Sequence, residues 1–305
     1  MNNKFTLIND DCIEVYKGKN YDNNKLRKNK KVMVFDLDET LGSFIELNLL
    51  YNTIENVLQK NDCVHFDELL DMYPEFLRNN IIKILRFIYK QKKKRNLDKL
   101  YLYTNNQSRG EFVERIVAYF TKKITNNNEA LFDQIIYAFK INDQIIQIGR
   151  TSHEKSFKDF IRCTLLPKNT SVCFIDDFNF DEMKKEQIYY IQPKPYTHGL
   201  SSKQIVDRLF AFKFKDCMKC NINKINDLFL AKCIHSKVYS LYSARNNAFE
   251  DMQNNISKKI MYYVKDYFFI INKNEKSKKK KKSLVISHVK IKININLFFV
   301  NIHMP

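Results

Sequence analysis

The sequence predicts an α/β fold in which a parallel sheet is flanked by helices. Short apolar runs alternate along the chain with longer segments of helical spacing, a pattern typical of parallel strands joined by helices. Three of these runs are followed directly by polar residues, namely Asp36, Thr104 and Asp176. The hydrophobic fraction of 44% in 305 residues is sufficient for a packed core.

The expected strands are the short apolar runs bounded by polar or turn residues. In chain order they are Lys31–Phe35, Leu100–Tyr103, Gln134–Phe139, a short edge strand Gln144–Ile148, Ser171–Ile175 and Ile188–Gln192. Ligands bind outside the carboxyl ends of parallel strands. The polar residues that follow these runs are therefore the first candidates for a functional site.

The expected helices have apolar residues spaced three and four apart, so that one face can be buried. They are Glu46–Gln59, Phe66–Tyr73, Phe76–Tyr89, Glu111–Phe120, Phe157–Leu166 and Ser202–Phe212. In Phe76–Tyr89, which has the strongest pattern, Leu77, Ile81 and Ile84 lie on one face.

These elements predict four parts of the chain. They are a lead-in at 1–24, an α/β domain at 25–212, a helical extension at 213–270 and a basic tail at 271–305. The domain contains a small helical insert at about 44–97, after the first strand. The tail has a Lys-rich stretch without core-forming residues and could therefore lack structure.

Positive charge is concentrated near the C-terminus. The formal net charge is +18, and residues 271–305 hold nine Lys and one Glu. Basic surfaces attract nucleic acid, anionic lipid or phosphorylated substrates. The run Lys278–Lys282 could bind nucleic acid or act as a nuclear import signal, but such runs are also common as solvated tails or as a coding bias. Nucleic acid stays open as a partner of the tail.

The expected location is intracellular, either cytoplasmic or nuclear. Seven Cys in 305 residues do not resemble a small disulfide scaffold. The first ten residues lack the apolar stretch of a signal peptide, and no run of about 18 uncharged apolar residues is present. We therefore expect a protein that is neither secreted nor embedded in a membrane.

A second group of candidate ligands lies in the helical extension. Cys217, Cys220, Cys233 and His235 form a set of three sulfur donors and one nitrogen donor that Zn²⁺ would accept. The spacing is not that of a familiar zinc finger, and apolar residues flank the set. Buried free thiols are the alternative interpretation.

The strongest chemical signal is the pair Asp36 and Asp38, two residues apart and directly after an apolar run. Phosphoryl transfer through an aspartyl-phosphate needs a carboxylate nucleophile and a second acid–base group. It also needs cations that offset the charge of the phosphoryl group. Carboxylate oxygens are the ligands that Mg²⁺ prefers, so Mg²⁺ is the expected cofactor.

These residues resemble the motifs of the haloacid-dehalogenase (HAD) superfamily, whose fold is a Rossmann-like parallel sheet. The segment Asp36-Leu-Asp38-Glu-Thr40-Leu41 is similar to the first motif of its RNA-polymerase-CTD-phosphatase and NLI-interacting-factor branch. The remaining motifs match, in order, Thr104, Lys155 (with Lys158 as a rival), and the pair Asp176 and Asp177, with Asp181 as an accessory acid. The resemblance covers about residues 30–212.

The resemblance implies a role for each matched residue. Asp36 would attack phosphorus, and Asp38 would protonate the leaving group. Mg²⁺ would be held by Asp36, Asp176 and Asp177 and by the backbone carbonyl of Asp38. The substrate would be bound by Thr104, Lys155, Asn105 and Thr40, of which Lys155 would also orient the nucleophile and Thr40 would support its loop.

The expected function is Mg²⁺-dependent phosphomonoester hydrolysis, with a phosphorylated protein as the expected substrate of a Ser/Thr phosphatase. Two alternatives stay open: a phosphatase of a small metabolite, nucleotide or nucleic-acid end, and a HAD-fold binding module with weak activity. The chain departs from the CTD branch in two places. Asp177 stands where that branch often has Asn, and the insert is helical where that branch has a small sheet.

Overall fold

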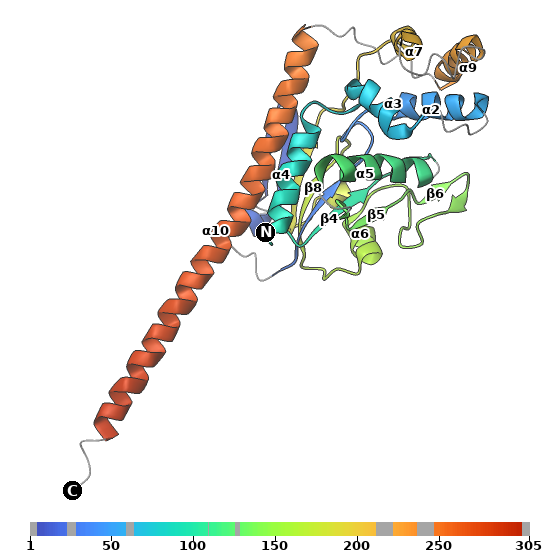
Figure 1. Ribbon diagram of the computed structural model, residues 1–305. Coiled ribbons are helices and arrows are strands. Elements are labelled where there is room, and N and C mark those ends of the chain that lie inside the picture. Colours follow the sequence, from blue (N-terminus) through green and yellow to red (C-terminus); the bar gives the residue numbers. More distant parts are fainter. Residues whose placement is uncertain are drawn as a thin grey trace.

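The computed structural model has an α/β architecture with a long C-terminal helix (Figure 1). It describes residues 5–22, 29–58, 64–108, 110–125, 129–211, 222–236 and 247–300, with side chains of the last helix up to Lys273. Within these ranges, no helix combines the length and apolar content needed to cross a bilayer.

A seven-stranded sheet forms the centre, in the order β1-β2-β9-β8-β3-β4-β5. Its strands are β1 Thr6–Asp10, β2 Ile13–Lys17, β3 Lys31–Phe35, β4 Lys99–Tyr103, β5 Gln134–Ile136, β8 Ser171–Ile175 and β9 Ile188–Pro193. The five strands from β9 to β5 are parallel, and β1 and β2 add an antiparallel hairpin at one edge. The predicted α/β class with a mostly parallel sheet is confirmed, and it is compatible with a Rossmann-like fold.

The strand order reverses beside β3. The chain runs from β3 through β4 to β5 on one side, and then returns to build β8 and β9 on the other side. In open α/β sheets the crevice for ligands forms at such a switch point, outside the carboxyl ends of the strands. The residues that follow β3 and β8 flank this position.

Helices cover the two faces of the sheet unequally. The helices are α1 Lys19–Asp22, α2 Ile45–Val57, α3 Phe66–Met72, α4 Ile81–Lys93, α5 Gly110–Ile124, α6 Phe157–Thr164, α7 Ser202–Ala211, α9 Ile222–His235 and α10 Asn247–Val300, with 3₁₀ turns η1 Pro74–Phe76 and η2 Asp181–Met183. Side chains of α4, α5 and α10 join one core cluster, whereas α6 and η2 supply the other. Figure 1 shows α10 running alongside α4.

The sheet alternates its side chains between these two clusters. On β3, Met33 and Phe35 join the cluster under α4, α5 and α10, whereas Val32 and Val34 join the cluster under α6. Successive side chains of a strand point to opposite faces, so a strand buried on both faces is apolar throughout. This is why Lys31–Phe35 has the continuous apolar run seen in the sequence.

Three elements differ from the sequence prediction. The lead-in 1–24 supplies β1 and β2, where alternating Ile13 and Val15 are buried against the core. The helix expected from Phe76 begins at Ile81, because Asn80 adopts a left-handed backbone with a φ of 60°. The expected edge strand Gln144–Ile148 is only β7 Gln144–Ile145, which pairs with β6 Lys140–Ile141 in a separate two-stranded sheet.

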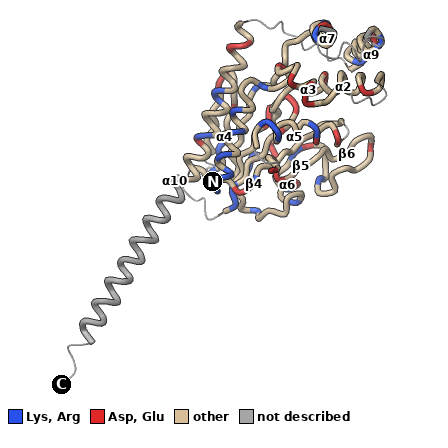
Figure 2. Tube along the Cα trace, in the orientation of Figure 1, with Lys and Arg blue, Asp and Glu red and all other residues tan. Residues whose placement is uncertain are grey.

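The C-terminal part is more regular than expected. The backbone of α10 continues into the basic tail as far as Val300, and no Gly or Pro interrupts it. Figure 2 shows both basic and acidic residues along the described part of α10. The side chains of Lys278–Lys282 lie outside the described residues.

The candidate zinc ligands are only partly placed. Cys217 and Cys220 lie outside the described residues. Cys233 is buried in the core cluster with α2 and α7, whereas His235 is exposed at the end of α9. For Cys233, this position matches the interpretation as a buried thiol.

Candidate functional site

The polar residues after β3, β4 and β8 are fixed by the backbone of the sheet. The Asp36 amide donates to the carbonyl of Ile175 at 2.9 Å, and the Thr104 amide donates to the carbonyl of Ile136 at 3.0 Å. The Asp176 amide extends the same pattern. These backbone hydrogen bonds therefore fix the positions of all three residues, although each belongs to a loop.

Lys155 lies between two of these acids. It immediately precedes the N-cap of α6, its side chain is only 2% exposed, and its Nζ contacts Asp36 Oδ1 and, at 2.6 Å, Asp176 Oδ2. Burial disfavours the ammonium form, but the two carboxylates outweigh burial and raise the pKa of Lys155. The rival Lys158 is exposed one turn later on α6. Lys155 is thus the lysine that reaches the acids.

An aromatic wall surrounds the Lys155 ammonium. Its Nζ lies 5.3 Å from the ring centre of Phe180 and 5.6 Å from that of Tyr103. Phe174 adds a third ring at 6.0 Å. These rings exclude water and attract the cation, which strengthens its interaction with the carboxylates.

Three carboxylates converge on one point. One oxygen each from Asp36, Asp176 and Asp177 lies within 4.8 Å of the others. Burial, followed by the charge of Asp36, raises the pKa of Asp177 to about 6. Thr40 opposes this effect, because its Oγ1 donates to Asp177 Oδ1 at 2.8 Å. Thr40 thereby joins the loop after β3 to the loop after β8.

The carboxylate of Asp38 bonds a residue of the loop after β4. Asn106 Nδ2 donates to Asp38 Oδ2 at 2.7 Å, and Asp38 Oδ1 is buried with no hydrogen-bond partner among the described residues. Burial and the nearby Asp36 charge raise the pKa of Asp38 to about 7. Near neutral pH this group can therefore both give and take a proton.

The loop after β3 is clamped by Arg78, a residue that the sequence analysis did not select. Arg78 Nε donates to the carbonyl of Thr40 at 2.7 Å, and its Nη2 donates to the carbonyls of Glu39 and, at 2.9 Å, of Lys194. Glu39 has a φ of 59°, an unfavourable conformation for a non-glycine residue, and this clamp supports it. Arg78 is 1% exposed and comes from the helical insert.

A second buried arginine clamps the loop after β4. Arg150 Nη1 donates to the carbonyl of Thr104 at 3.1 Å, and Nη2 donates to Asn105 Oδ1 at 2.7 Å. The guanidinium also lies over the Tyr103 ring, 4.8 Å from its centre. Thr104 Oγ1 accepts from the amide of Asn106 at 2.9 Å and so shapes this loop. No local sequence pattern marks either arginine.

The acids open into a cavity of about 660 Å³. Of the residues selected from the sequence, six line it: Asp36, Asp38, Asn105, Lys155, Asp176 and Asp177. Thr40 and Thr104 are buried behind this lining, each 1% exposed. Asp181 lies outside it, exposed and 3.6 Å from Lys184. The cavity rim adds Phe178, which is 64% exposed.

The site thus combines a buried carboxylate, an adjacent cation, two further acids and, in Asp38, a carboxyl group with a raised pKa at one edge of the sheet. Such a set can hold a divalent cation or carry out nucleophilic and acid–base chemistry. Comparison of the chain with protein-family models, curated proteins and solved structures found no match.

Proposed function

We propose that the protein is a Mg²⁺-dependent phosphatase of the HAD type that works through an aspartyl-phosphate on Asp36. The observation that carries this proposal is the convergence of Asp36, Asp176 and Asp177 within 4.8 Å, with Lys155 in contact with two of them. These residues come from loops that are far apart in the sequence, yet they match the motifs of that superfamily in order.

The donor set fits Mg²⁺. All three converging groups are carboxylates, and no described residue donates a hydrogen bond to Asp36 Oδ2 or Asp177 Oδ2. Burial and, after it, the negative charge of Asp36 raise the pKa of Asp177, and a divalent cation would offset both effects. When bound there, Mg²⁺ would offset the negative charge of the phosphoryl oxygens.

The chain's own residues would divide the chemistry in two steps. In the first, Asp36 forms a bond to phosphorus, the bond from phosphorus to the ester oxygen breaks, and Asp38 gives its proton to that oxygen. In the second, Asp38 takes a proton from water as the water oxygen attacks phosphorus, which releases phosphate and restores Asp36. The pKa of about 7 suits Asp38 to both roles. Lys155 orients Asp36 throughout.

The charge of the cavity favours a phosphoprotein over a nucleic-acid end. Five acidic residues and one basic residue line it: Asp36, Asp38, Glu39, Asp176, Asp177 and Lys155. A polyanion would be repelled by this lining outside the metal position. A phosphorylated Ser or Thr brings its charge into the cavity on one group only, and the charges of its flanking residues stay outside this lining. The remaining lining is made of amide, hydroxyl and apolar side chains, which suit a peptide.

The test is hydrolysis of p-nitrophenyl phosphate with and without Mg²⁺. We expect wild type to be active only with Mg²⁺, and Asp36→Asn to lose about 1,000-fold or more in kcat/KM, because the amide is a poor nucleophile. Asp67→Asn removes a surface carboxylate that bonds Lys122 and serves as the matched control. Mass spectrometry after acid quenching should find the phosphoryl group on Asp36.

Two outcomes would contradict the proposal: an inactive wild type that binds no Mg²⁺, or an Asp36→Asn variant as active as wild type. If the enzyme is active, kcat/KM for panels of phosphopeptides and nucleotides would separate the substrate classes. We expect kcat/KM to be higher for phosphoserine or phosphothreonine peptides than for nucleotides.

A further inference from the structure

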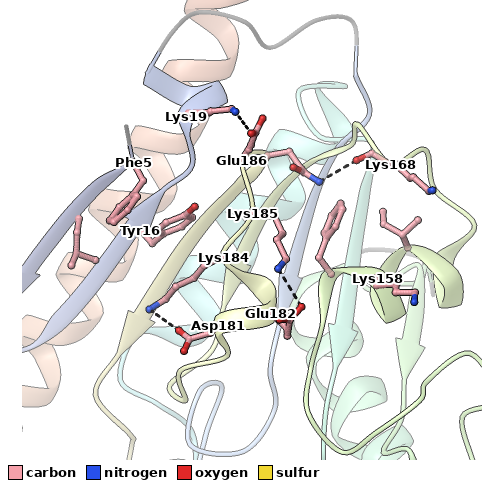
Figure 3. Close-up of a pocket in the computed structure, with 14 residues that line it drawn as sticks. Phe5, Tyr16, Lys19, Lys158, Lys168, Asp181, Glu182, Lys184, Lys185 and Glu186 are labelled. Atoms are coloured by element: carbon pink, nitrogen blue, oxygen red, sulfur yellow. Dashed lines mark hydrogen bonds and ion pairs between the residues drawn. The ribbon is translucent and has the colours of Figure 1, made fainter. Parts of the chain in front are cut away.

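A second and larger cavity, called the groove below, lies on the sheet face that α6 only partly covers. Its volume is about 950 Å³, and its apolar lining is Phe5, Leu7, Tyr16, Phe157 and Ile161. Figure 3 shows Phe5 and Tyr16 on one side of it and Lys158 and Lys168 on the other. Phe5 and Leu7 are 52% and 50% exposed. Exposed apolar side chains that line a hollow are typical of an interaction site.

The rim of this groove has an excess of positive charge. Its three acids each contact a rim lysine: Glu186 contacts Lys19, Glu182 lies 3.2 Å from Lys185, and Asp181 lies 3.6 Å from Lys184. Two further rim lysines, Lys158 and Lys168, form no ion pair with any described residue. A ligand with acidic groups would therefore meet two uncompensated cations.

The groove adjoins the acidic cavity, which is the cavity lined by Asp36, Asp176 and Asp177. Two segments of the chain line both. In the loop after β8, Phe180 lines the acidic cavity and Asp181 lines the groove. Before and within α6, Lys155 lines the acidic cavity and Phe157 lines the groove. The two cavities therefore border the same two segments, and a chain with its phosphate at Asp36 would reach the groove by crossing one of them.

We propose that this groove docks a flanking segment of the phosphoprotein substrate, in which apolar residues alternate with Asp or Glu. The proposal rests on the proposed function and names the substrate class of that site. Apolar side chains would fill the floor, and acidic side chains would face Lys158 and Lys168. Tethering through the groove raises the effective concentration of the phosphorylated residue at Asp36, so it lowers KM without changing the chemical step.

The first test reverses the two uncompensated charges with Lys158→Glu/Lys168→Glu. The substrate is a phosphoserine peptide flanked by alternating Leu and Glu. We expect its KM to rise about tenfold, while kcat and the hydrolysis of p-nitrophenyl phosphate stay unchanged. Both lysines are exposed, so the variant should fold. Lys83→Glu/Lys90→Glu changes the same charge on exposed positions of α4 and should leave KM unaffected.

The second test addresses the apolar floor and the choice of partner. Leu7→Ser, at a half-exposed position, should raise KM for the Leu/Glu peptide about threefold. A phosphopeptide with Lys in place of Glu should not show the tenfold rise in KM in Lys158→Glu/Lys168→Glu, because its cations would face the introduced carboxylates. An unchanged KM for the Leu/Glu peptide in both groove variants would overturn the proposal.

Binding of the unphosphorylated Leu/Glu peptide, followed by fluorescence anisotropy, separates docking from catalysis. This peptide should bind wild type about tenfold more tightly than Lys158→Glu/Lys168→Glu, whether or not Asp36 is intact. Docking would thus be tested even if the phosphatase proposal failed. If phosphatidylserine vesicles or single-stranded RNA lose binding in the double variant and the peptide does not, the groove serves another partner and the proposal is wrong.

Discussion

The two faces of the sheet differ in how completely helices cover them. One face is covered by α4, α5 and α10 and carries a core that reaches into the helical insert, α7 and α9. Among the described residues, the other face has α6 and the short η2 over a compact cluster of apolar residues. Beside that cluster the groove is left open, next to the acidic cavity. Most of the buried apolar residues therefore lie on one face, and the smaller cluster and the groove lie on the other.

The largest expected contrast comes from placing a carboxylate on each face. Val264 of α10 is fully buried in the first cluster, so Val264→Asp should lower the free energy of unfolding by more than about 4 kcal/mol. Ile161 of α6 is only partly buried beside the groove, so Ile161→Asp should cost about 1 kcal/mol. Urea denaturation monitored by circular dichroism measures both.

If Val264→Asp fails to fold, Val264→Ala still tests the covered face. It should cost about 2 kcal/mol, because it leaves a cavity where α10 packs on the sheet. Equal costs for the aspartates at 264 and 161 would show that the two faces contribute equally to stability.

A smaller loss of stability is expected when either of the two buried arginines, Arg78 or Arg150, is replaced. Arg78→Lys replaces two nitrogens of a planar group that reach three backbone carbonyls by a single ammonium, and Arg150→Lys similarly weakens the loop after β4. Each should lower the free energy of unfolding by about 2 kcal/mol. If the phosphatase proposal is correct, kcat for p-nitrophenyl phosphate should fall about tenfold with little change in KM, because the loops lose their positions.

Arg86→Lys is the matched control for both clamps, since Arg86, on the surface of α4, donates to one carbonyl, that of Lys123 on α5. Its stability and kcat should equal those of wild type. A loss of stability in the clamp variants with an unchanged kcat would indicate that the arginines serve the fold alone.

The smallest effect concerns Asp133, an ion-pair centre away from the cavity. Burial disfavours its carboxylate, but Lys92 at 2.6 Å, the Leu100 amide and Lys99 outweigh burial and lower the pKa of Asp133 below its usual 3.8. A lowered pKa contributes stability above pH 3.8 that is lost as the pH falls through the folded-state value. Asp133→Asn should therefore cost about 1 kcal/mol at pH 7 and less below pH 4.

The check is urea denaturation of wild type and Asp133→Asn between pH 7 and pH 3. A difference that grows toward acid pH would contradict the stated direction of the pKa shift. Asp67→Asn again provides a surface control, because its ion pair with Lys122 is exposed.

The strands that carry the site could be predicted because their own residues define them. Lys31–Phe35 and Ser171–Ile175 are apolar on both faces, and each is followed directly by an acid. The β1–β2 hairpin was missed because β2 is fully buried on one face only and β1 is not fully buried on either, so the apolar pattern of both strands is weak. Its signal was the alternation of Ile13 and Val15 after the turn at Asp11–Cys12.

The sequence by itself determined the α/β class and the strand ends that carry Asp36, Thr104 and Asp176, whereas the roles proposed for these residues rest on the resemblance to the HAD motifs. Those features follow from local periodicity and from motifs of a few residues. Only the tertiary structure decided that Lys155 rather than Lys158 reaches the acids, and that a groove adjoins them. It also revealed Arg78 and Arg150, because a buried cation that bonds distant carbonyls leaves no pattern in the residues beside it.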